Sequence, residues 1–317
     1  MSEVLYQAIN SVLTLFLIGL VGYSLARIGL ITNNIKSFFP IMVVRVTLPS
    51  FLLSSTVKNY ARADLSLLAN WIGLGLVTVT LTYGLAFLIS HFIIRPQGRR
   101  RGIFCAAFSF SNTMYIGIPI NLALFGDQAL GPAMAYFLAN GIFFWTIGNY
   151  LMSLDGQFGK VPIVSLETVK RLLPPPMIGF AIGIFLVLIG FQPPKFFLDA
   201  ATLLGSMNTP LAIMYIGLGF YGLSLSSLKP IKEVIAVLGG RFLICPAITV
   251  TFCLLAQTQT LTTQVFTTQS ALPVLAASSI MAGYYQSDTN YANVLVSLST
   301  ILSLLTIPLI RVLVIYL

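Results

Sequence analysis

The chain has 317 residues, of which 57% are hydrophobic and only 8% are charged. A soluble domain carries about a quarter charged residues, so this composition excludes a soluble globular protein and predicts an all-α integral membrane protein. The formal net charge of +9 does not indicate a nucleic-acid partner, because the 17 Lys and Arg residues are scattered between apolar runs and form no patch.

Apolar segments that cross a bilayer as helices need about 20 residues. The N-terminal sequence MSEVLYQAIN carries an acid and no basic residue, so we expect no cleavable signal peptide and the first apolar run should remain as a span. Ten transmembrane helices are predicted, at residues 5–30, 37–57, 66–94, 102–124, 129–152, 172–191, 197–222, 231–256, 263–284 and 290–316.

Basic residues predict the orientation of these spans. Eleven of the 17 lie in or beside the connections that follow odd-numbered spans, and four lie on the opposite side. The remaining two, Arg45 and Arg241, lie within spans. By the positive-inside rule, we expect cytoplasmic odd-numbered connections and both termini outside, in a multi-pass protein of the plasma (inner) membrane.

The two halves of the chain indicate an internal repeat. Gly29 and Pro49 are 20 positions apart, as are Gly190 and Pro210, and the two segments match at an offset of 161 without a gap. We predict a first five-helix repeat at 1–152, a cytoplasmic connection at 153–171 and a second repeat at 172–317. Because five spans is an odd number, the second repeat is inverted, and inverted repeats with broken helices are typical of secondary transporters.

The fourth predicted span contains SNTMYIGIPI, which begins at Ser111 and combines polar with helix-breaking residues. Pro119 lacks an N–H and Gly117 adds backbone freedom, so an ordinary kink is one interpretation. Asn112 and Thr113 lie one to two turns earlier, and irregular backbone at membrane depth persists only where protein or a water-filled cavity satisfies it. We therefore predict a break at Gly117 and Pro119 that presents Asn112 and Thr113 to a substrate.

The ninth predicted span carries Pro273 and then the run AASS, which ends in Ser278 and Ser279, where the repeat predicts a second break. Small residues let two helices cross closely, so a plain packing interface explains this run almost as well. Because span four provides a counterpart, we predict a break at Pro273 and Ser278, with Ser278 and Ser279 at the substrate site.

Three segments carry a family resemblance: SNTMYIGIPINLALFGD in span four, RFLICPA in span eight and QSALP in span nine. Together they resemble the auxin efflux carrier family of PIN-like transporters, in a short form of the bacterial type, over essentially the whole chain. The resemblance implies that spans four and nine cross at their broken midpoints, with the substrate site beside the crossing. By the same resemblance, Asn112, Gly117 and Pro119 fall at the first half of that crossing.

The sequence departs from the plant members of that family at three places. Ser278 stands where plant carriers have a second proline, so the break in span nine is expected to be softer. Asn70 and Leu74 stand near an acidic and basic pair of the plant pattern, so a proton-linked role of that pair does not transfer. The long cytosolic loop of the plant carriers is also missing.

Arg45 and Arg241 are the only charges well inside the predicted spans. Ionisable residues are costly in hydrocarbon, which makes each a candidate for function, and a permanently protonated arginine favours an anion. The alternative for both is that the side chain reaches the membrane interface. We predict that both contribute to the substrate site, with the resemblance supporting Arg241 more than Arg45.

The remaining reactive side chains do not indicate a metal site, a cofactor or an enzyme. Cys105, Cys245 and Cys253 are isolated in apolar segments, and the single histidine, His91, lies at a span end. No acid lies inside a span; Asp288 follows the second predicted break and is expected to cap the next helix. The coupling ion, H⁺ or Na⁺, is therefore left open.

The sequence thus predicts a secondary transporter of small organic anions, such as auxin-like or carboxylate weak acids, that works by alternating access. The expected partners are that anion, the lipid bilayer and a second copy of the chain. One alternative is a sodium-coupled symporter that resembles the bile-acid family. An intramembrane enzyme would need a His, a Cys or paired acids facing a cavity. A channel is not distinguished from a carrier by composition, but saturable flux would separate them.

Overall fold

The computed structural model describes most of the chain, and every element named within that part is helical. The described residues are 14, 17–31, 35, 38–59, 65–156, 175–221 and 231–314. The all-α class is therefore confirmed, and it agrees with an integral membrane protein. Residues 5–13 of the first predicted span, and the predicted connection from residue 157 on, lie outside the described residues.

Among the described residues, three helical runs are long and apolar enough to cross a membrane: Leu67–Phe92, Asp127–Leu154 and Ile231–Leu255. The segments Thr289–Ser303 and Leu305–Val314 meet at 54° and pass the same test only as a pair. Several other helices are apolar but shorter. The membrane class is supported by these helices, while the count of ten spans stays a prediction.

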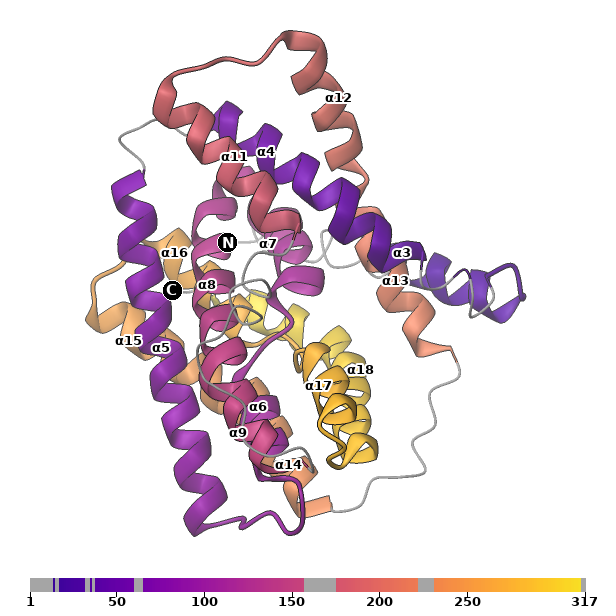
Figure 1. Ribbon diagram of the computed structural model, residues 1–317, viewed down its shortest axis with the longest axis vertical. Helices are drawn as coiled ribbons and strands as arrows, with labels where there is room; N and C mark the ends of the chain where they lie inside the picture. The colour runs from indigo at the N-terminus through magenta and orange to yellow at the C-terminus, as the bar shows by residue number, and fades with distance from the viewer. Residues whose placement is uncertain are drawn as a thin grey trace.

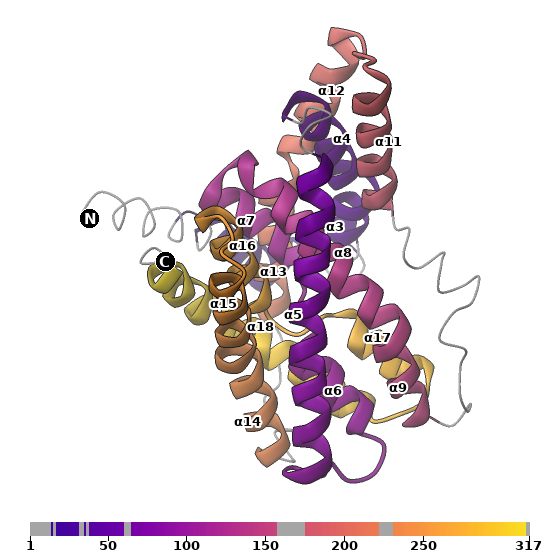
Figure 2. The ribbon, with the colours of Figure 1, turned by 90° about the vertical axis from the view of Figure 1, so that its left-hand side faces the viewer.

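One group of helices lies at the top and right of Figure 1, and its helices α4, α11 and α12 lie at the top of Figure 2. Helix α11 runs along α4, and α12 also packs against α4. Buried Leu48, Leu52, Met177 and Phe180 lie between α4 and α11, in an apolar cluster that also contains buried residues of the segment 118–134. The elements of this group are α3 (Phe38–Met42), the π-helical segment η1 (Val43–Thr47), α4 (Leu48–Asn59), α11 (Pro175–Ile189), α12 (Lys195–Ser206) and α13 (Asn208–Phe220).

The second group is larger and fills the middle and lower part of Figure 1, with the long helix α5 along one side. Helix α5 packs against α8 and α6, and the buried side chains of α6 enter a core of aromatic and aliphatic residues. The elements from the first half of the chain are α5 (Leu65–Phe92), α6 (Arg101–Ser109), η3 (Thr113–Gly117), α7 (Ile118–Phe125), η4 (Asp127–Ala129), α8 (Leu130–Phe143), η5 (Phe144–Gly148) and α9 (Asn149–Leu154).

The second half of the chain completes this group. Helix α16 packs against α15 and α8, and α14 and α17 pack against α6. The elements are α14 (Ile231–Gly239), η6 (Gly240–Ile244), α15 (Cys245–Leu255), α16 (Thr260–Ser270), α17 (Ala277–Tyr284) and α18 (Thr289–Val314). Segments that are about 160 residues apart in sequence therefore share one core.

Three connections meet at the lower end of this group in Figure 1. The α5–α6 connection contributes Arg99 and Arg100, which bond to Gln286 and Asp288 in the α17–α18 connection. Asp155, just after α9, accepts hydrogen bonds from the first turn of α6. These connections follow the odd-numbered predicted spans three, five and nine. Their position at one end of the group is the one expected for a chain that crosses the membrane once with each span.

Candidate functional site

Two helical segments are interrupted, and the two interruptions pair with each other. Helix α6 ends at Ser109 and is followed directly by extended main chain, whereas helix α16 ends at Ser270 and is followed by a turn before the chain pairs at residues 273–275. Residues 110–112 run antiparallel to residues 273–275: the Asn112 N–H donates to the Pro273 carbonyl at 2.9 Å, and the Leu275 N–H donates to the Phe110 carbonyl at 3.1 Å. Two distant parts of the chain thus meet by main-chain hydrogen bonds inside a helical protein.

The extended residues are buried, so their remaining polar groups need partners. Asn140 of α8 bonds both main-chain groups of Ser111, accepting from its N–H at 3.2 Å and donating to its carbonyl at 3.1 Å. The hydroxyl of Ser299 in α18 accepts from the Val274 N–H at 3.0 Å. Sequence reasoning missed Asn140 and Ser299, although an isolated asparagine in an apolar helix was an available signal.

Asn112 and Thr113 lie where the first interruption ends. The main-chain carbonyl of Asn112 accepts from the Gly117 N–H at 3.0 Å, which starts the π-helical segment η3. The Asn112 side chain is 6% exposed, and its Oδ1 atom has no hydrogen-bond partner. Thr113 is buried as the first residue of η3. The structure therefore places both predicted residues directly beside the paired interruptions.

Gly117 and Pro119 lie after the interruption rather than in it. Gly117 closes η3, and Pro119 is the second residue of α7, which continues η3 as one helical run from Thr113 to Phe125. A Cβ atom on Gly117 would lie 2.1 Å from Oε1 of Gln269, so glycine is what lets the α16 side chain approach. The helix is interrupted at 110–112, and Asn112 directly precedes the new π-helical turn, although its side chain makes no capping hydrogen bond.

The second interruption contains Pro273 and ends before Ser278. Pro273 lies in the non-helical stretch 271–276, where it donates no hydrogen bond and its carbonyl accepts from Asn112. Ser278 is the second residue of α17, fully buried, with an unpaired hydroxyl. Ser279 is half-buried and donates to Oδ1 of Asn293 in α18. The break therefore comes at Pro273 and not at Ser278.

The two intramembrane arginines lie in different surroundings. Arg241, in η6, is 0% exposed and donates from Nη2 to the carbonyl of Ser270, the last residue of α16. Its Nε and Nη1 atoms have no partner. Arg45, in η1, is exposed, and η1 packs against α11, α12 and α13. The structure brings Arg241 to the end of a half-helix at the interruption and leaves Arg45 on the surface of the other group.

Helices α7 and α16 add two buried amides that the sequence reasoning did not select. Asn121 donates from Nδ2 to the Gly117 carbonyl at 2.8 Å, and Gln269 donates from Nε2 to the Ala133 carbonyl at 3.1 Å. Both side chains are 0% exposed, and the oxygen atom of each amide has no hydrogen-bond partner. The site thus holds several unpaired oxygen atoms around Gly117.

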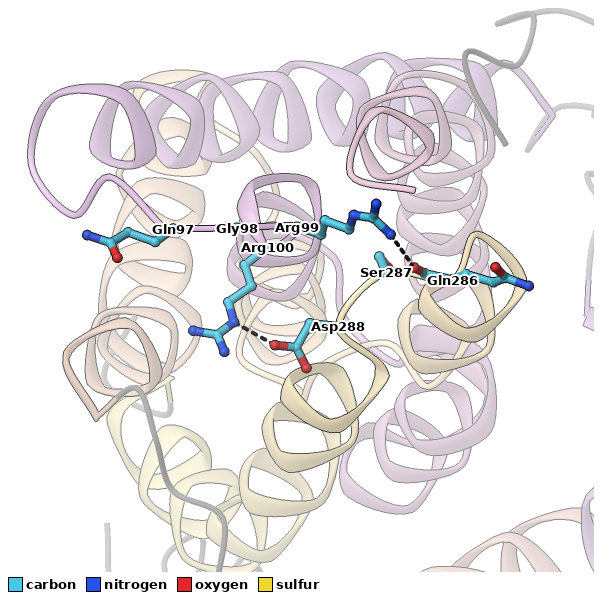
Figure 3. Close-up of a pocket in the computed structure, with 7 residues that line it drawn as sticks. All are labelled: Gln97, Gly98, Arg99, Arg100, Gln286, Ser287 and Asp288. Atoms are coloured by element: carbon cyan, nitrogen blue, oxygen red, sulfur yellow. Dashed lines mark hydrogen bonds and ion pairs between the residues drawn. The ribbon is translucent and has the colours of Figure 1, made fainter. Parts of the chain in front are cut away.

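A pocket of about 470 Å³ lies at the end of the bundle where the connections meet, as Figure 3 shows. Arg100 points to Asp288, with Nε 2.6 Å from Oδ2, and Arg99 points to the Gln286 carbonyl at 3.3 Å. Asp288 also accepts from the Tyr291 N–H at 3.0 Å, which confirms that it caps α18. The pocket is lined by Gln97, Gly98, Arg99, Arg100, Gln286, Ser287 and Asp288.

Asp155 anchors α6 from the same end of the molecule. Its Oδ2 atom accepts from the N–H groups of Gly102 and Ile103 at 2.6 and 3.2 Å, in the first turn of the helix. Burial raises the pKa of the Asp155 carboxyl to about 6, although these two hydrogen bonds and the nearby Arg101 act in the opposite direction. A carboxylate at a helix N-terminus is favourable, so Asp155 stabilises the N-terminal end of α6, the half-helix that leads to the interruption.

Comparison with known proteins gives one family and two relatives. The family described as "Membrane transport protein" matches residues 7–311. A protein described as an uncharacterized transporter from Methanothermobacter thermautotrophicus is 25% identical over 308 residues, covering 95% of this chain and 96% of that protein. A second protein so described, from Methanocaldococcus jannaschii, is 25% identical over 310 residues, covering 94% of this chain and 96% of its own.

Proposed function

Since the chain belongs to the membrane transport protein family, the group of auxin efflux carriers and PIN-like proteins, we propose that it is a secondary transporter of small organic anions. Members of this family are membrane transporters and not enzymes. The two relatives carry no substrate in their names, so the substrate class, the site and the mechanism proposed below are argued from this chain.

The observation that carries the proposal is the pairing of the two interruptions. Main chain that leaves a helix within a membrane persists where protein or a water-filled cavity satisfies its polar groups. Of the helices that follow, η3 with α7 begins at Thr113, next to Asn112, and α17 begins at Ala277, two residues after Leu275. The positive ends of helix dipoles attract anions. A carboxylate at this place would lie in the field of both helix ends and of Arg241.

The proposed contacts follow from where the side chains lie. Asn112, Thr113 and Ser278 are buried beside the interruptions, and Ser279 lies one residue further along α17. Gly117 and Pro119 shape the start of α7 and are proposed to act through the backbone. Arg45 is exposed in η1, in the group that contains α4 and α11. It is proposed to act as a surface charge that does not contact the substrate directly.

We propose that the chain is an inverted repeat of five plus five spans, with α6–α7 and α16–α17 as its broken spans four and nine. Backbone conformation supports this, because residues with positive φ recur in pairs at nearly constant offsets. Gly29 and Gly190 are 161 residues apart, Arg95 and Gln257 are 162 apart, and Gly126 and Gln286 are 160 apart. These conformations are rare for residues other than glycine, so their recurrence at the sequence offset of 161 favours two halves with one fold.

The proposed mechanism is alternating access between the two helix groups. The interruptions, Arg241 and the buried amides all belong to the larger group, while α4, α11 and α12 pack tightly on one another in the other group. A shift of the larger group against the smaller would carry the bound anion between the two sides of the membrane. Dimerisation through a second copy of the chain remains part of this proposal.

The experiment that tests the proposal is current measurement on purified protein in liposomes on a solid support. Indole-3-acetate, malate, malonate and other weak acids are applied in turn, with and without sodium and a pH gradient. We expect a saturable current with at least one acid, lost in Asn112→Ala. Asn208→Ala is the matched control, because Asn208 is also a buried asparagine with an unpaired amide but lies in α13 of the other group.

A folded protein that gives no current with any acid would refute the proposal of an organic-anion carrier. Current that rises linearly with concentration would indicate a channel instead. Normal current in Asn112→Ala would remove Asn112 from the substrate site.

The orientation proposed from the basic residues, in the plasma (inner) membrane with cytoplasmic odd-numbered connections, has its own test. Gln97 is exposed in the α5–α6 connection, and the three native cysteines are buried. A Gln97→Cys variant should react with a membrane-impermeant thiol reagent in inside-out vesicles and be protected in intact cells. The reverse pattern would invert the proposed topology.

A further inference from the structure

We propose that the protein holds a sodium site beside Gly117, formed by side-chain oxygens of Asn121 and Gln269 where α16 passes η3. The inference rests on the proposed transport function in one respect, because this ion would be the coupling ion of the carrier. The site itself is argued from the hydrogen bonds of these two amides.

The orientation of both amides is fixed by their nitrogen atoms. Nδ2 of Asn121 faces the Gly117 carbonyl at 2.8 Å, and Nε2 of Gln269 faces the Ala133 carbonyl at 3.1 Å. Turning either amide over would set two acceptors against each other, so the nitrogen must keep its place. The oxygens, Oδ1 of Asn121 and Oε1 of Gln269, are therefore the atoms left buried without a partner.

Both oxygens belong to side chains that surround Gly117. Oε1 of Gln269 lies 2.1 Å from where a Cβ of Gly117 would be, and Asn121 bonds the carbonyl of the same residue. The Gly117 N–H bonds the main chain of Asn112, whose own Oδ1 atom is also buried and unpaired. Asn121, Gln269 and Asn112, each with an unpaired oxygen, thus all bond to or pack against Gly117.

These atoms need a donor or a cation, since a buried acceptor without either costs free energy. A substrate carboxylate is itself an acceptor and would be repelled by amide oxygens. A water molecule could also donate to both oxygens, but it would leave the stability of the protein independent of sodium. A hard cation needs only oxygen ligands, and a set of neutral oxygens without a carboxylate suits a single positive charge better than a divalent ion.

Arg241 does not occupy this place. Its guanidinium bonds the main chain of α16 at Ser270, whereas the amide of Gln269 reaches α8 and η3. The arginine and the proposed ion therefore have different partners at the two interruptions. An organic anion near Arg241 and a cation near Gly117 would bind close together with opposite charge, so each favours binding of the other.

The test is thermal unfolding of the purified full chain in detergent at rising NaCl, with choline chloride keeping the ionic strength constant and KCl in parallel. A ligand that binds only the folded state at about ten times its Kd raises the folding equilibrium about 11-fold. We expect sodium to raise the Tm by a few degrees and potassium to raise it less. No rise over choline, or an equal rise with potassium, would overturn a sodium site.

Variants test whether Asn121 and Gln269 produce the sodium-dependent rise in Tm. Gln269→Met and Asn121→Leu remove the two oxygens and should abolish the sodium shift. Gln264→Met is the matched control, because Gln264 lies on the same helix but its amide donates to the Val314 carbonyl at 2.9 Å. Gln269→Glu keeps an oxygen and adds a negative charge, so the half-saturating sodium concentration should fall by about tenfold or more. If the first two variants fail to fold, an unchanged half-saturation in Gln269→Glu overturns the proposal.

The outcomes separate this site from the transport function. Organic-anion current that does not depend on sodium, together with no sodium shift in Tm, would refute the cation site and leave the anion carrier standing. A sodium shift that is lost in Gln269→Met, without current for any organic acid, would establish the site and refute the anion substrate.

Discussion

Replacing Gly117 with alanine tests the close approach of η3 and α16 that the site depends on. A Cβ atom at this position would lie 2.1 Å from Oε1 and 3.0 Å from Cδ of Gln269, and 2.5 Å from Cδ1 of Leu272. Real Cβ atoms essentially never come within 3.0 Å of other heavy atoms. The Gln269 side chain must therefore withdraw, and its hydrogen bond to the Ala133 carbonyl is lost.

The magnitude follows from three contributions. Overpacking of a well-filled core costs about 1–3 kcal/mol. The lost hydrogen bond costs about 1 kcal/mol, and the better helix propensity of alanine returns up to about 1 kcal/mol. We expect Gly117→Ala to lower the free energy of unfolding by about 1–3 kcal/mol, which for a large domain lowers the Tm by roughly 5 °C.

The assay is thermal unfolding in detergent, followed by transport measurement on the folded fraction. Gly141→Ala is the matched control, because Gly141 lies in helix α8 and a Cβ there would meet nothing within 4 Å. Its Tm should stay constant or rise. A second variant that also carries Gln269→Ala should regain part of the lost stability. Equal Tm values for Gly117→Ala and the parent protein would refute the reasoning that glycine is required for the crossing.

Two further predictions concern groups that fix the interrupted helices. Because burial raises the pKa of Asp155 to about 6, the folded chain binds a proton between about pH 4 and 6 that the unfolded chain does not, so lowering the pH through this window should stabilise the protein by at most about 3 kcal/mol. Unfolding measured from pH 4 to 7 should show this dependence in the parent and less of it in Asp155→Asn; identical slopes would contradict the assignment. Asn140→Leu removes both hydrogen bonds to Ser111 and should cost about 2–4 kcal/mol while leaving two buried main-chain groups unpaired. A loss below about 0.5 kcal/mol in chemical unfolding would show that the Ser111 main chain finds other partners.

The candidate site was predictable where a local pattern signals a local conformation. The polar residues Asn112 and Thr113 next to Gly117 and Pro119 indicated an irregular segment, and the structure places it within seven residues of the predicted position. Its residue boundaries were not predictable, because Pro119 lies inside the helical run Thr113–Phe125 and does not mark the break. The interruption begins where Asn112 pairs with Pro273, and that partner lies far away in the sequence.

The role of Arg241 shows the same limit. Sequence reasoning selected it because a charge in an apolar span is costly, and the structure buries it fully at the interruption. Only the fold shows that its first partner is the carbonyl of Ser270 at the end of α16. Arg45 carries the same charge in a similar apolar sequence but lies exposed, whereas Val43 and Thr47 of the same segment η1 are buried.

The sequence by itself determined the class of the protein, its helical content and its family. Each depends on sums over short windows or on short motifs, since about 20 apolar residues suffice to place a helix in a bilayer whatever the rest of the chain does. The tertiary structure decided where the helices break, that Asn140 and Ser299 satisfy the extended main chain, and that the oxygens of Asn121 and Gln269 remain unpaired at Gly117. These features depend on contacts between residues that are up to about 160 positions apart, and no local pattern specifies which partner a buried polar group will meet.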